Sequence, residues 1–154
     1  MSLATTIDKV ILVIRSAIIG IAPAPVSYVL CKGVYDNDQQ AFGAYPVICV
    51  GVPSDVDETF PVIAQHSVRD EQYTIKIVAY VKFADTAANT RQIITLTESI
   101  RAAIRADMKP PLEPLDGDAY QGDLATSNFG FTEKGDIPLR GSVTMVRYIQ
   151  RIVV

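Results

Sequence analysis

The 154-residue chain has few of the side chains on which enzymes most often rely: one histidine, His66, and two cysteines, Cys31 and Cys49. Histidine is the only side chain whose unperturbed pKa suits proton transfer near neutral pH. His66 stands next to Ser67 in a polar segment, and neighbours along a loop rarely orient a nucleophile and its base together. The sequence therefore disfavours a catalytic arrangement of Ser67, His66 and Asp70.

The two cysteines are too few and too far apart for a disulfide framework or a zinc site, and neither belongs to a CxxC pair. We expect both to be buried free thiols, which suits a reducing cytoplasm. The segment Asp116-Gly117-Asp118 resembles a fragment of a calcium loop but lacks the glutamate of the twelfth loop position. No Walker loop, dinucleotide-binding glycine motif, HExxH motif or nucleophile elbow occurs. We predict that the chain is not an enzyme and uses no cofactor and no metal.

Basic residues form no long run, and the formal net charge is −3 at pH 7. Direct nucleic-acid binding usually needs a basic stripe along the phosphate backbone, so we do not expect sequence-specific binding. The apolar stretch from Val10 to Ala22 is split by Arg15 and is shorter than the about 20 residues that span a bilayer. We expect no membrane anchor. Asp8 and Arg15 also disfavour an export signal over residues 1–24.

The chain is rich in apolar residues, with 49% hydrophobic residues and a mean hydropathy of +0.22. The charged fraction of 20% lies below the roughly 25% typical of globular domains. Surplus apolar residues on exposed strands or loops would mark an assembly interface, and a well-filled core is the alternative explanation. The length suits one domain over residues 1–154 with a single core.

The clearest structural pattern runs from Gln72 to Ala106, where a period of two gives way to helical spacing. Apolar residues alternate between Tyr73 and Phe83, which predicts a half-buried strand. Asp85 or Thr86 can then cap a helix. The apolar stripe of that helix consists of Ile93, Leu96, Ile100, Ala103 and Ile104. Such a stripe needs a sheet on which to lie.

The remaining segments predict one more helix, which comes earlier in the chain, and further strands. A first amphipathic helix begins at Thr5 or Thr6 and is stopped by Gly20 and Pro23. The other predicted elements are a short strand at Val26 to Leu30, a loop at Gly33 to Gly43, a strand at Tyr45 to Val52, a polar excursion over 54–71, an irregular stretch over 107–123, a hairpin turning at Glu133 to Asp136, and a final strand at Leu139 to Val154. The predicted fold class is α+β, with two main amphipathic helices packed on a mostly antiparallel β-sheet.

This order of elements resembles the tail terminator, or tail completion, proteins of tailed bacteriophages. The family has an amphipathic N-terminal helix, a strand with an aromatic-or-Leu-Pro start, a loop, a long alternating strand, a helix and closing strands. The matching stretches are Ile7 to Ile19, Tyr45-Pro46-Val47-Ile48-Cys49-Val50, Gln72 to Val81, Asn89 to Ile104 and Val143 to Val153. The resemblance covers most of the chain and rests on order and pattern, without an invariant catalytic motif.

The resemblance implies a structural subunit of the virion tail or neck, assembled in the host cytoplasm. It implies a homo-oligomer, a hexameric ring that caps the last ring of tail tube protein, ends tube polymerisation and offers a surface to head-tail connector or neck proteins. DNA passes through such a ring.

A closed ring with head-to-tail contacts needs two different patches on each subunit. The candidates from the sequence are the acidic segment and the end of the last strand. The residues are Asp55, Asp57, Glu58, Asp70 and Glu71 in the acidic segment, and Arg147 and Arg151 in the last strand. Opposite charges would favour a specific register between subunits. The acidic residues could instead line a channel for DNA.

Two other interpretations stay open at this point. One is another head-tail connector subunit, such as a stopper, or a tail tube or baseplate component. The other is a small-ligand-binding or enzymatic α+β domain that uses a pocket between helix and sheet, with His66 at its rim.

Overall fold

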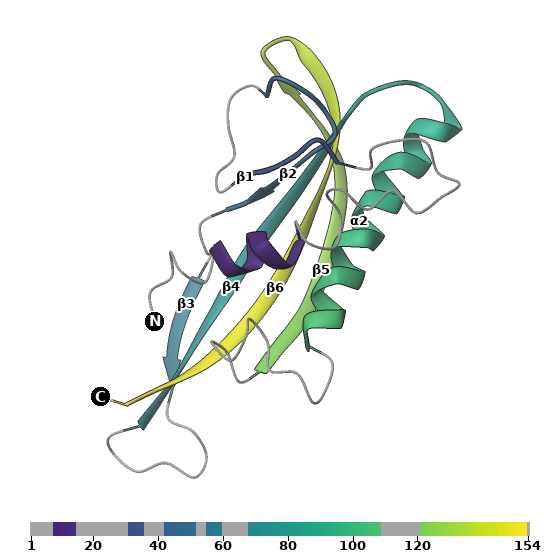
Figure 1. The fold of residues 1–154 in the computed structure, drawn as a ribbon. Helices are drawn as coiled ribbons and strands as arrows, with labels where there is room; N and C mark the ends of the chain where they lie inside the picture. The colour runs from purple at the N-terminus through teal and green to yellow at the C-terminus, as the bar shows by residue number, and fades with distance from the viewer. Residues whose placement is uncertain are drawn as a thin grey trace.

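In the computed structural model, the described residues are 8–14, 31–35, 42–51, 55–59, 68–108 and 121–153. They form a short helix over residues 8–14, a long helix α2 (Ala87–Met108) and six strands (Figure 1). The strands are β1 (Gly33–Tyr35), β2 (Val47–Val50), β3 (Asp55–Thr59), β4 (Val68–Lys82), β5 (Gln121–Lys134) and β6 (Ile137–Val153). The described part of the chain is therefore α+β, as the sequence predicts.

The strands form one sheet in the order β1-β2-β4-β6-β5, and β3 also pairs with β4. Among the described strands, only the short β1–β2 pair is parallel, and the other pairs are antiparallel. β4 and β6 pair along the whole of β4, from Val68↔Val153 to Lys82↔Leu139. On the other edge of β4, β2 pairs with residues 77–80 and β3 with residues 70–74. The long strands β4 and β6 are thus the centre of the sheet.

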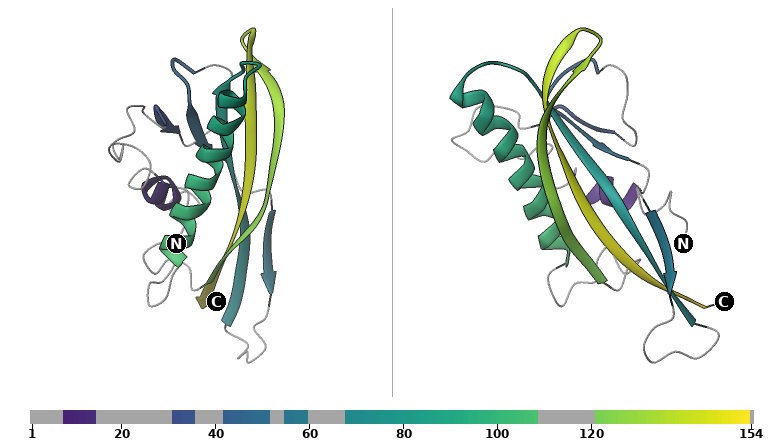
Figure 2. Two further views of the ribbon diagram at one scale, coloured as in Figure 1. Left: turned by 90° about the vertical axis from the view of Figure 1, so that its right-hand side faces the viewer. Right: turned by 180° about the vertical axis from the view of Figure 1, so that it is seen from behind.

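Both helices lie on the same face of the sheet (Figure 2). Their apolar stripes meet alternate residues of β4, among them Ile75 and Ile77, in the main core. All five stripe residues predicted for α2 are buried. The opposite face of β4 carries a second core in which Val78 and Tyr80 pack with Phe42 and Tyr45. The part of β4 that pairs with β2, residues 77–80, is therefore buried on both faces, whereas the sequence predicts a half-buried strand.

Helix α2 begins with a side-chain cap and ends near a proline pair. The hydroxyl oxygen of Thr86 accepts a hydrogen bond of 3.1 Å from the backbone N–H of Asn89, three residues on. This bond satisfies one of the N–H groups that lack a partner in the first turn, and it identifies Thr86 rather than Asp85 as the capping residue. The helix ends at Met108, just before Lys109-Pro110-Pro111 in the sequence.

The hairpin predicted near the C-terminus is confirmed. β5 and β6 pair from Gln121↔Ile149 to Lys134↔Ile137, and the turn consists of Gly135 and Asp136. Both turn residues have positive φ, 55° and 67°, which matches the right-handed twist of a two-residue hairpin. The register shifts between Leu124 and Ser127, where β5 carries a bulge.

Two predicted loops contain strands. The predicted loop at Gly33 to Gly43 includes β1, and the predicted polar excursion over 54–71 includes β3 and the first residues of β4. The physical reason for β3 is the length of β4: its 15 residues extend beyond the four-residue β2, and β3 satisfies backbone groups along the rest of that edge. β2 is also shorter than the predicted strand at Tyr45 to Val52. The predicted strand at Val26 to Leu30, both ends of the first helix and residues 109–120 lie outside the described residues.

Candidate assembly surfaces

The interface residues predicted from the sequence come together at one end of the sheet. Asp55, Asp57 and Glu58 lie in β3, Asp70 and Glu71 in β4, and Arg147 and Arg151 in β6. In the register, Asp55 aligns with Thr74, Thr74 with Arg147, and Arg147 with Asp123 of β5. Asp70 aligns with Arg151. The sequence treats the acidic segment and the two arginines as separate patches, whereas the structure places them in one region of a single subunit. Their role as an interface stays a prediction.

The register aligns both oppositely charged and like-charged residues across neighbouring strands in this region. The exposed Arg147 stands directly across from the exposed Asp123, a cross-strand arrangement that contributes about 0.2–1 kcal/mol. Glu58 of β3 and Glu71 of β4 are register partners. Like charges directly opposite each other are unfavourable. The register therefore aligns acidic residues of β3 and β4 with each other, while Arg147 and Arg151 of β6 align with Asp123 and Asp70 of the same chain.

An aromatic patch at the other end of the sheet is a surface that the sequence analysis does not identify. It consists of Phe83, Phe129 and Phe131, which are 39%, 56% and 70% exposed. The rings of Phe83 and Phe131 meet edge to face with centroids 5.7 Å apart, and the guanidinium of Arg140 lies 5.0 Å from each centroid. Phe129 and Phe131 are visible in the sequence as hairpin residues, but their exposure depends on which face α2 covers.

Asn89 anchors the aromatic patch to the start of α2. Its Oδ1 accepts hydrogen bonds from the backbone N–H of Ala84 at 3.1 Å and from Nε of Arg140 at 2.6 Å. Its Nδ2 donates to the carbonyl of Lys82 at 2.6 Å. The side chain is only 7% exposed. One buried amide therefore joins the end of β4, the start of α2 and the Arg140 side chain of β6.

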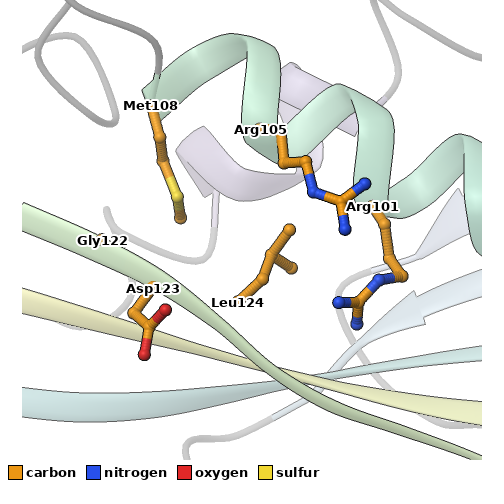
Figure 3. Close-up of a pocket in the computed structure, with 6 residues that line it drawn as sticks. All are labelled: Arg101, Arg105, Met108, Gly122, Asp123 and Leu124. Atoms are coloured by element: carbon orange, nitrogen blue, oxygen red, sulfur yellow. The ribbon is translucent and has the colours of Figure 1, made fainter.

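A pocket of about 320 Å³ lies where the last turns of α2 face the start of β5 (Figure 3). Its lining consists of Arg101, Arg105, Met108, Gly122, Asp123 and Leu124. Arg101 donates a hydrogen bond of 2.8 Å to the hydroxyl of Ser127, which lies 2.9 Å from the hydroxyl of Thr144. Arg105, one turn further along the helix, is exposed. The sequence suggests a pocket between helix and sheet as one alternative but does not indicate these lining residues, because the two walls come from α2 and β5, which are separate segments of the chain.

The residues weighed for chemistry lie only partly within the described part of the chain. His66 and Ser67 lie outside the described residues, and Asp70 is a buried residue of β4. Cys31 and Cys49 are free and buried, as predicted. Burial raises the pKa of the Cys31 thiol, and its hydrogen bonds with the backbone of Gly33 and Ile48 partly offset this effect.

The described residues contain neither a cluster suited to a metal ion nor a helix suited to a membrane. No three His, Cys, Asp or Glu side chains there are grouped so that they could hold a metal ion. No helix there is both long enough and apolar enough to cross a membrane.

Comparisons with known proteins add a structural likeness. No model of a protein family matches the chain, and a search of curated proteins finds no match. Among solved structures, a chain of the "Virion of native gene transfer agent (GTA) particle" is 14% identical and superposes with a TM-score of 0.46. The match covers 97% of this chain and 99% of that chain. A likeness at this level establishes neither the family nor the function of the chain.

Proposed function

We propose that the chain is a structural subunit of a phage or prophage tail, a tail terminator that forms a hexameric ring at the end of the tail tube. The order of elements supports the proposal. A helix precedes the strands, the long strand β4 leads directly into the long helix α2, and a hairpin closes the chain. This is the order on which the resemblance to tail terminators rests.

The observation that carries the proposal is the exposed aromatic patch of Phe83, Phe129 and Phe131. Phe129 and Phe131 are largely exposed to solvent in one copy, although the Phe131 ring is held in place through Arg140 and Asn89. Aromatic residues grouped on a surface mark contacts with other proteins, because burying them upon association is favourable. We assign the patch to a contact with the tail tube protein or a neck protein.

The mechanism is one of complementary surfaces, with no bond-making step. One face of the ring takes the place of the next ring of tube protein, and the other face does not repeat that surface. Tube growth then ends because no continuing interface is available, and the free face receives the neck proteins. The ring leaves a central channel for DNA.

Electron microscopy of the purified chain mixed with its tail tube protein tests the proposal. We expect rings at the ends of tubes that stop growing. Replacing Phe129 and Phe131 by serine should leave the ring but raise the ring concentration that caps half of the tubes at least about tenfold, the effect of losing about 1.4 kcal/mol of contact. Leu12→Ser is the matched control, because Leu12 is 65% exposed and lies on the helix over residues 8–14.

Three results would contradict the proposal. Uncapped tubes with the unaltered chain would exclude a terminator, and incorporation along the whole tube would favour a tube subunit. A monomer that carries a bound small molecule would favour a ligand-binding domain.

A further inference from the structure

The proposed ring, on which this inference rests, requires two different patches on different sides of each subunit. The acidic segment and the β6 arginines share one end of the sheet, where Asp70 aligns with Arg151. The sheet has two lateral sides: β3 lies on one, and β5 with α2 lies on the other (Figures 1 and 2). The complement to the acidic edge should therefore be sought beside α2 and β5.

The β3 side is acidic in sequence. Three of the five residues of β3 are Asp or Glu, and β4 adds Asp70 and Glu71 across from its last two residues. No basic residue occurs in β3 itself. Glu58 and Glu71 are register partners, so acidic residues occupy neighbouring backbone positions of β3 and β4, and a positive surface on another copy would complement this edge.

The α2 side offers cations at a recess. Arg101 and Arg105 are four residues apart, so they stand on the same side of the helix. Figure 3 shows both guanidinium groups beside the recess, while the carboxylate of Asp123 points away from them. Ser127 holds Arg101 by a hydrogen bond of 2.8 Å. The recess therefore presents two adjacent positive charges, which favour a bound carboxylate.

We propose that the acidic edge strand β3 of one copy docks at the Arg101–Arg105 pocket of a second copy. The pocket volume of about 320 Å³ accommodates a carboxylate side chain, and Met108 and Leu124 supply an apolar wall for its methylene groups. A guanidinium binds a carboxylate with two parallel hydrogen bonds, which fixes orientation as well as charge. Since the two patches lie on opposite sides of the sheet, each copy donates one and receives one, as a ring demands.

A charge exchange tests this pairing. The first variant is Arg105→Glu, and the second replaces Asp55, Asp57 and Glu58 by lysine. Each should raise the dissociation constant of the oligomer at least about tenfold, because like charges then face each other at every interface. The variant that combines all these changes restores opposite charges and should recover most of the loss. Native mass spectrometry over a concentration series measures the populations, and circular dichroism verifies that each variant is folded.

Arg91→Glu is the matched control, since Arg91 is also an exposed arginine of α2 but does not line the pocket. It makes the same change in net charge and should leave the oligomer unchanged. The inference is overturned if either charge variant assembles like the unaltered chain, or if the combined variant assembles no better than the single ones. Those results would leave the proposed function standing, whereas a chain that stays monomeric without any substitution would remove both.

Discussion

Replacing Asn89 by alanine should lower the free energy of unfolding by about 3 kcal/mol. The substitution removes three hydrogen bonds of a nearly buried side chain: two with the backbone of Lys82 and Ala84 and one with Arg140. A neutral hydrogen bond contributes about 1 kcal/mol and one to a charged group about 1.5–3 kcal/mol. Water can reach part of the exposed 82–84 segment after the change, so the loss stays below the full sum.

Chemical denaturation at a fixed protein concentration measures the effect, because assembly also shifts apparent stability. A loss of about 3 kcal/mol corresponds to a fall in melting temperature of roughly 6–12 °C for a chain of this size. Ser99→Ala is the control: its hydroxyl donates to the carbonyl of Thr95 at 2.8 Å on the exposed side of the same helix, and its loss should cost nothing measurable.

A double-mutant cycle with Arg140→Ala isolates the bond between the two side chains. We expect a coupling energy of about 1–2 kcal/mol between positions 89 and 140. A change below about 1 kcal/mol for Asn89→Ala, or a coupling near zero, would refute the view that this amide holds β4, α2 and β6 together.

Two further predictions concern charge and pH. If Arg147 and Arg151 lie in the interface, as their charge and position in the last strand predict, replacing both by glutamate should weaken the oligomer. Native mass spectrometry measures the effect, and the pair Lys76→Glu and Arg91→Glu is the charge-matched control. An unchanged ring would remove these two arginines from the interface. Because burial raises the pKa of Cys31 above its ordinary value of 9.0, the folded state favours the protonated thiol. The buried thiol therefore contributes to the free energy of unfolding below pH 9, and this contribution is lost as the pH rises through the higher pKa of Cys31 in the folded state. The unfolding free energy should therefore fall less steeply above pH 9 in Cys31→Ser, and parallel curves for the two proteins would contradict this.

The elements that the sequence predicts well are those whose pattern is set by one buried face. The alternation in β4 and the three-and-four spacing of Ile93, Leu96 and Ile100 in α2 mark the faces that pack in the main core, and the structure buries those residues. The second core, on the opposite face of β4, is not marked by that alternation. The hairpin is also predictable, because a turn at Glu133 to Asp136 separates two runs of strand-forming residues.

What the sequence misses depends on contacts between distant segments. β3 is polar and has no apolar alternation that would mark it as a strand; it forms because part of the β4 edge is left unpaired by the short β2. The Arg101–Arg105 pocket requires the end of α2 to face the start of β5. The exposure of Phe131 likewise follows from where α2 stops covering the hairpin.

The seven charged residues selected from the sequence illustrate the same limit. Their charges identify them as candidates for contacts, but only the register shows that Arg147 and Asp55 belong to one row across the sheet. A charge pattern alone does not reveal which opposite charges already face each other within one copy.

Native mass spectrometry of the unaltered chain tests the central claim, that the protein works as an assembled ring, most directly. Measured over a range of concentrations, the spectrum should show one closed species with the mass of a hexamer of the 16.8 kDa chain and no bound small molecule. Isolated single copies at every concentration, or an open series of sizes without a preferred one, would contradict the account.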